Sequence, residues 1–176
     1  MKDFYEVEKI FYSNENDSTL SNQTDKFQLE LYFPINSHFA SLNIARIMAA
    51  CPDSQYRDGR RAIDYANKGM KLIEKYNKYF DKEAQRRLRL QLPSQLAILA
   101  ASYAENRNYQ EAIKIQEQSI EIIRQLIDDM IIKSEKNPKE QVKKNIEKSL
   151  AEAEKVLGLY RDGKPYRSPI PVKPIN

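Results

Sequence analysis

Apolar residues recur at steps of three and four positions along most of the chain, which is the spacing of a helix with one buried face. The first predicted helix has Ser37 as its N-cap and ends near Cys51, where Pro52 follows. A second helix starts after the connector at residues 51–59 and runs to about Tyr79. The pattern therefore predicts a pair of helices in this part of the chain.

A second group of helices follows a charged segment at residues 81–92, which is predicted to be helical in part. Pro93 marks a new start, because proline is tolerated in the first turn of a helix. This short helix ends near Asn106. A longer helix begins at about Tyr109 and has apolar stripes on two sides, as expected of a helix between two neighbours. The last predicted helix covers residues 139–160.

The N-terminal residues 1–36 have a different pattern. Apolar side chains alternate with polar ones over residues 27–33, which predicts a short strand or an extended arm, and Pro34 is expected to end it. The C-terminal tail is rich in proline and is predicted to be extended. The sequence thus divides into an arm or linker at 1–36, a helical domain at 37–167 and a proline-rich tail at 168–176.

Two stretches of the helical domain resemble each other, with small residues where two helices would approach closely. In the later stretch, the residues on signature positions of the tetratricopeptide repeat are Leu99, Ala100, Tyr103, Tyr109, Ala112, Ser119 and Ile120. The blocks CPDSQYRDGRRAIDYANKG, LAASYAENRNYQEAIKIQEQSIE and LYRDGKPYR resemble, in this order, a bacterial variant of the repeat. The similarity covers about residues 38–167, although Arg107 occupies a position where glycine is usual.

The resemblance implies an all-α fold, built as a stack of antiparallel helical hairpins with two repeats and a C-terminal capping helix. It also implies a non-catalytic adaptor that binds a protein or a peptide. The seams of the two hairpins are expected at Ala45 with Ala62 and at Ala100 with Ala112. The first helix of each pair would line a groove, whose residues would be Phe39, Leu42, Arg46, Ala49, Ser94, Ala97, Ala101 and Glu105.

The residues predicted to line the groove also indicate which kind of ligand it can bind. Leu42 and Ala97 stand where the chaperone-binding subclass of the repeat needs a cation to clamp a terminal carboxylate, so that ligand is not expected. A groove of this composition fits an apolar or mixed segment, such as a helix or an extended peptide. The chain's own N-terminal arm is one candidate occupant.

The residues that commonly carry chemistry have no partners in this sequence. His38 is the only histidine and Cys51 the only cysteine, so neither has the companions that a metal site or a nucleophilic mechanism needs. The sequence also holds no phosphate loop and no nucleophile elbow. We therefore expect no catalytic, cofactor-binding or metal-binding residue, and Cys51 is interpreted as a small buried hydrophobe.

Two charged blocks are interpreted as structural. In YRDG, Tyr56 is expected to pack, Arg57 to bridge carbonyls or acids, and Asp58 to cap the next helix. The GKPYR block at residues 163–167 is expected to fold the tail back, with Tyr166 as a buried plug.

Charge is spread unevenly but mildly along the 176 residues, whose formal net charge is +4. Residues 1–36 hold 3 basic and 7 acidic residues, while residues 133–176 hold 11 basic and 6 acidic ones. So shallow a gradient disfavours nucleic-acid binding, and the arginine cluster at 86–89 has no aromatic residue for base stacking. The basic face that this less favoured alternative would use consists of Arg86, Arg87, Arg89, Lys143 and Lys144.

Two further alternatives stay open at this point, a self-assembly or homodimerisation module and an accessory domain of a larger complex. No stretch approaches the ~18 apolar residues of a membrane span. The first residues lack the order of a signal peptide, so a cytoplasmic location is expected if Met1 begins the natural chain.

Overall fold

The computed structural model of the chain describes residues 23–133 and 140–169, and within them the fold consists of helices without a strand. In chain order, α2 covers Gln23–Ala50, α3 Gly59–Tyr76, α4 Lys82–Glu105, α5 Tyr109–Lys133 and α6 Glu140–Arg161. Two short 3-10 helices, η2 at Ser54–Tyr56 and η3 at Asn77–Tyr79, lie between α2 and α4. The predicted all-α class is confirmed for this part of the chain.

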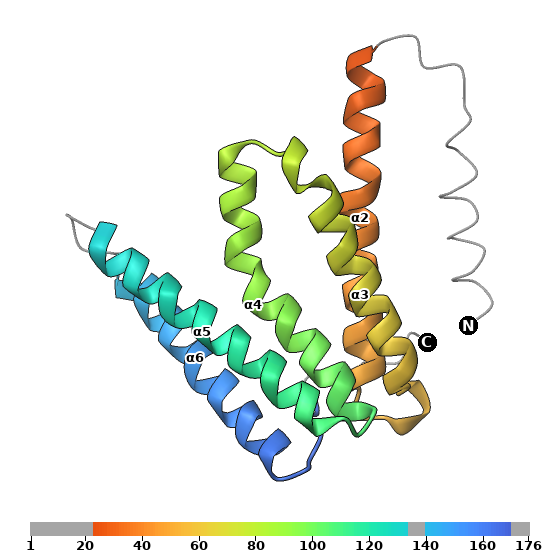
Figure 1. Ribbon diagram of the computed structural model, residues 1–176, viewed down its shortest axis with the longest axis vertical. Coiled ribbons are helices and arrows are strands. Elements are labelled where there is room, and N and C mark those ends of the chain that lie inside the picture. The colour runs from red at the N-terminus through yellow and green to blue at the C-terminus, as the bar shows by residue number, and fades with distance from the viewer. Residues whose placement is uncertain (1–22, 134–139, 170–176) are drawn as a thin grey trace.

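Helices that follow each other in the chain lie side by side. α2 packs against α3, α4 against α5 and α5 against α6, while α4 also contacts both α2 and α3. In Figure 1, α2 and α3 run in opposite directions, as do α4 and α5, whereas α2 and α4 run in the same direction. α4 is therefore the central helix, placed between the first pair and the last two helices.

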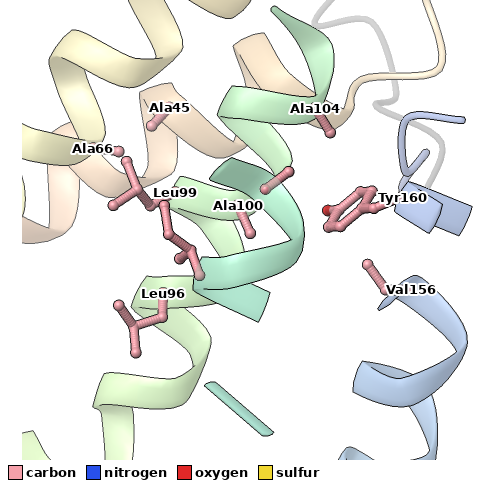
Figure 2. Close-up of a cluster of buried hydrophobic side chains, with 10 residues drawn as sticks. Ala45, Ala66, Leu96, Leu99, Ala100, Ala104, Val156 and Tyr160 are labelled. Carbon is pink, nitrogen blue, oxygen red and sulfur yellow. The ribbon is translucent and has the colours of Figure 1, made fainter. Parts of the chain in front are cut away.

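Small residues occupy the positions where these helices meet. Ala45, Ala62, Ala100 and Ala112, which were predicted to lie in the seams, have no exposed surface, so their predicted burial is confirmed. Figure 2 shows that Ala45 and Ala66 lie near Leu99, while Val156 and Tyr160 approach from the other side. Alanine thus lets the backbones approach, and a few larger side chains fill the remaining space.

The prediction of an extended segment at residues 27–33 is wrong, because these residues are helical. They belong to α2, which continues through Pro34 and Ser37, so Pro34 ends no element and Ser37 is not an N-cap. The alternation is short, and its Gln, Glu and Leu residues are good helix formers. The predicted boundary after residue 36 therefore falls inside α2, and residues 1–22 lie outside the described part.

Pro93 also lies inside a helix rather than at its start, which corrects a second prediction. Two serine hydroxyls donate hydrogen bonds to backbone carbonyls at or near this proline. The Ser94 hydroxyl donates to the Gln91 carbonyl at 2.7 Å, and the Ser119 hydroxyl of α5 donates to the Pro93 carbonyl at 2.9 Å. Figure 1 shows α4 changing direction between its two halves, which is the usual effect of an internal proline.

The YRDG connector places the start of α3 directly against the end of α4. Asp58 caps α3 as predicted, since its side chain accepts from the Arg61 backbone N–H at 3.0 Å. Tyr56 was expected to pack, but its side chain is exposed because the short η2 turn buries none of its residues. At Gly59, an added Cβ would lie 2.4 Å from the Asn106 nitrogen. Glycine is therefore required at this position by a close backbone approach.

We predict opposite effects for alanine at two glycines. Gly59→Ala is expected to lower the free energy of unfolding by about 1–3 kcal/mol, because its Cβ would meet the backbone of Asn106. Gly158→Ala is expected to raise the free energy of unfolding by about 0.5–1 kcal/mol. Gly158 lies on the exposed side of α6, and nothing lies within 4 Å of an added Cβ there. Urea unfolding of both variants measures the difference. Equal effects would contradict the close approach of α3 to α4.

Candidate protein-binding face

One side of α4 carries a row of residues spaced three and four positions apart, namely Leu90, Ser94, Ala97, Ala101 and Glu105. Residues at this spacing share one face of a helix. Leu90 is 51% exposed, Ser94 is exposed and Ala97 is half-buried. The part of the row nearest the N-terminus of α4 is therefore open to solvent.

α2 contributes to the same side of the molecule. His38 of α2 and Gln95 of α4 face each other, since His38 Nε2 lies 3.2 Å from Gln95 Nε2. Because α2 and α4 run in the same direction (Figure 1), the residue after His38 and the residue before Gln95 turn toward one side. Phe39 and Ser94 are those residues, and they therefore share a face.

We call this surface the α2–α4 face, and its exposed or half-buried members are Phe39, Arg46, Leu90, Ser94 and Ala97. Phe39, with 42% of its side chain exposed, is its largest accessible aromatic residue. Three further residues predicted to line the groove, Leu42, Ala49 and Ala101, are buried. They pack between the helices and are not open to a ligand in this structure.

Glu105, the last predicted groove residue, is held by two arginines, and its side chain is only 15% exposed. Arg57 Nε donates to Glu105 Oε1 at 3.1 Å, and Arg167 Nη1 lies 2.7 Å from Glu105 Oε2. Arg57 Nη1 also donates to the carbonyls of Cys51 and Pro52 at 3.0 and 2.8 Å. The predicted bridging role of Arg57 is confirmed, and Glu105 has a charged partner on each carboxylate oxygen.

The tail after α6 folds back onto the ends of α2 and α4, as predicted for the GKPYR block. Arg167 Nη1 donates to the Ala49 carbonyl at 3.4 Å, and the Ser168 backbone N–H donates to the Ala50 carbonyl at 2.8 Å. These are among the last carbonyls of α2, which have no partner within the helix. The tail therefore covers the end of α2 and satisfies its orphan acceptors.

Tyr166 sits on the same surface, half-buried against the core rather than fully buried as predicted. Burial raises the pKa of its hydroxyl, the Glu152 carboxylate adds to this rise, and the Arg46 cation opposes it. The hydroxyl is thus influenced by one charge on α6 and one on α2. The tail itself lies against Glu105 at the end of α4 and against the last carbonyls of α2.

His38, the single histidine, has a structural environment. It is fully buried, and its Nδ1–H donates to the Gly69 carbonyl at 2.8 Å. Since a carbonyl can only accept, Nδ1 carries the proton and Nε2 accepts from the Gln95 amide. Burial lowers the pKa of His38, and the Gly69 hydrogen bond partly offsets this. The ring is neutral and links α2, α3 and α4.

Other residues that could carry chemistry are buried or isolated. Cys51 is buried, as its interpretation as a small hydrophobe predicts. In residues 23–133 and 140–169, no three His, Cys, Asp or Glu side chains come together as a metal site would require. Over the same ranges, no helix combines the length and the apolar character needed to cross a bilayer.

Four of the five basic residues of the nucleic-acid alternative have local acidic partners. Arg86 and Arg87 both pair with Glu83, and Arg89 pairs with Asp129 across α4 and α5 at 3.3 Å. Lys143 pairs with Glu147 along α6. These are exposed ion pairs on solvated helices, and each reduces the positive field that a phosphate backbone would meet.

A shallow depression of about 890 Å³ lies between α5 and α6 on another side of the molecule, with Ile120, Ile122 and Leu157 among its lining residues. Two ion pairs cross it, between Arg124 and Glu154 at 2.9 Å and between Arg161 and Glu117 at 2.8 Å. Four of its charged lining residues are thus already paired with each other.

Comparisons of the chain with protein family models, with curated proteins and with solved structures found no match. The case for a function therefore depends on this chain's own residues.

One member of the α2–α4 face, Leu90, and one contact next to it, between Arg167 and Glu105, were missed from the sequence. Leu90 lies four positions before Ser94 on the same helical face, but the predicted start at Pro93 separated the two residues. Arg167 stands far from Glu105 in the chain, and no local pattern indicates that they meet. A helix continued through Pro93 would have placed Leu90 correctly.

The buried neutral histidine predicts a pH dependence of stability. The pKa of His38 is lowered in the folded chain, so the unfolded chain takes up the proton first, near pH 6.5. Stability contributed by His38 is therefore complete above pH 6.5 and is lost as the pH falls below it. We expect the free energy of unfolding to fall more between pH 7.5 and 5 in the wild type than in His38→Gln.

Urea unfolding at several pH values measures this difference, and the variant controls for the carboxylates that titrate in the same range. Parallel pH curves for the two proteins would contradict a buried neutral His38.

Proposed function

We propose that the chain is a non-catalytic protein-interaction module of the tetratricopeptide-repeat kind, which binds a peptide or protein segment on the α2–α4 face. The observation that carries the proposal is the exposed pair of Phe39 and Leu90 beside the small residues Ser94 and Ala97. A large apolar anchor next to small side chains leaves room for a partner's side chains. Arg46 adds a polar contact at the edge.

The backbone supports the repeat assignment at one further position. Arg107 stands where the repeat usually has glycine, and its φ is 61°, in the left-handed region that glycine adopts readily. The chain at this turn therefore has the conformation that the repeat's glycine would provide. Together with the buried alanines of the two helix pairs, this favours two repeats followed by α6 as a capping helix.

A matched pair of variants tests the face. Phe39 and Ile47 are both on α2 and have nearly equal exposure, 42% and 41%. Ile47 is turned about 80° further around the helix, away from α4. Peptides selected from a random phage-displayed library against the full chain serve as probes. We expect Phe39→Asp to weaken their binding by about tenfold or more and Ile47→Asp to leave it within about twofold.

Equal losses in both variants, or no enriched peptide, would contradict the proposal. Light scattering on the same proteins separates the self-assembly alternative. A mass of twice 20.6 kDa that returns to 20.6 kDa in Phe39→Asp would assign the face to a second copy of the chain.

A further inference from the structure

Next to the α2–α4 face, the ends of α2 and α4 already hold a peptide segment, because the chain's own tail is seated there. Its contacts include those between Arg167 and Glu105, between Arg167 and the Ala49 carbonyl, and between Ser168 and the Ala50 carbonyl. The guanidinium forms an ion pair with the carboxylate and donates to one carbonyl at the end of α2, and a backbone N–H donates to the other. Any extended segment with an arginine at the matching position offers the same donors.

The ring of Tyr166 supplies the apolar part of this contact. It packs against the core cluster that includes Tyr160 of α6. A short segment with an aromatic residue followed by arginine can therefore make both contacts, the aromatic ring against the core and the arginine against Glu105. This pairing of an aromatic anchor with a charge-assisted hydrogen bond is selective for sequence as well as for charge.

The tail can leave without exposing an unpaired buried charge. When Arg167 moves away, Glu105 keeps Arg57 at 3.1 Å, and Arg57 keeps its two carbonyl acceptors. The segment joins α6 through a turn at Gly163, whose φ is +69° and which has no neighbour within 4 Å of an added Cβ. The attachment is thus a turn that stays bonded to α6, since the Lys164 backbone N–H donates to the Leu159 carbonyl at 2.8 Å, and Glu105 keeps one charged partner when the site is empty.

We propose that the surface formed by Glu105, Arg57 and the last carbonyls of α2, next to the α2–α4 face, is a binding site for extended segments that carry an aromatic–arginine pair. The chain's own residues 166–168 are its resident occupant. A partner segment of the same chemistry binds by displacing them. The inference rests on the proposed function and specifies its ligand and its regulation.

The test uses full-length protein and a fluorescent, end-blocked peptide with the sequence GKPYRSP, which is residues 163–169 of this chain. Arg167→Glu places a carboxylate against Glu105 and is expected to vacate the site. We expect this variant to bind the peptide, and the wild type to bind it about tenfold more weakly, because its own tail competes at a millimolar effective concentration. Fluorescence anisotropy measures both affinities.

Arg161→Glu is the matched control, since it reverses an exposed arginine of α6 whose partner is Glu117, away from the face. It is expected to behave like the wild type. The peptide GKPYESP and the double variant Glu105→Gln/Arg167→Glu are both expected to abolish binding. If Arg167→Glu loses the wild-type circular dichroism spectrum, Tyr166→Ala takes its place, because it removes only the half-buried ring.

Binding that is equal in the wild type and the vacated variant would overturn the inference, as would no binding to the vacated variant at millimolar peptide. These outcomes are distinct from failure of the proposed function, which is judged at Phe39 with unrelated peptides. Library peptides that need Phe39, combined with no binding of GKPYRSP, would leave the function standing and reject the site.

Discussion

The close approach of α2, α3 and α4 at one buried junction sets the rest of the arrangement. An added Cβ on Gly69 of α3 would lie 3.1 Å from Leu42 Cγ and 3.2 Å from the His38 carbonyl oxygen, so the two backbones nearly touch. At the same place His38 donates to the Gly69 carbonyl and accepts from Gln95 of α4. A larger residue at position 69 would separate α2 from α3 and leave buried polar groups unpaired. One glycine and one histidine therefore fix both the spacing and the register of three helices.

This junction also decides which side chains a partner can reach. Residues on the line where α2 and α4 meet, such as Leu42 and Ala49, are enclosed because the helices are close. Residues turned to the flank of that line, such as Phe39 and Ser94, remain accessible. Close packing at alanines thus narrows the accessible surface to a strip. The buried members of the predicted groove support this strip from below, and the flanking residues form its accessible surface.

The sequence predicted the helices well where periodicity and capping agreed, as at Asp58, and it predicted the buried alanines of the seams. It failed at Pro34 and Pro93, because proline was interpreted as a boundary. A proline inside a helix removes one backbone hydrogen bond. The remaining hydrogen bonds of a long helix, together with two serine hydroxyls near Pro93, offset this loss. The contact of Arg167 with Glu105 depends on tertiary folding and has no local pattern. The repeat family and the binding function stay predictions.

The proposed exchange of the tail does not require the core to open, because the residues that stabilise the core differ from those that hold the tail. Tyr160 is fully buried beside Val156 and the alanines of α4, and burial raises the pKa of its hydroxyl, so the end of α6 belongs to the permanent core. Beyond Gly163, the contacts of the tail include a half-buried ring, hydrogen bonds to the carbonyls of Leu159, Ala49 and Ala50, and an ion pair whose carboxylate keeps a second partner. Partly exposed ion pairs contribute little net stability, and removing one of two partners orphans no charge. Replacement of the tail by a segment of the same chemistry therefore exchanges equivalent contacts, and the boundary between fixed and exchangeable structure falls at the turn after α6.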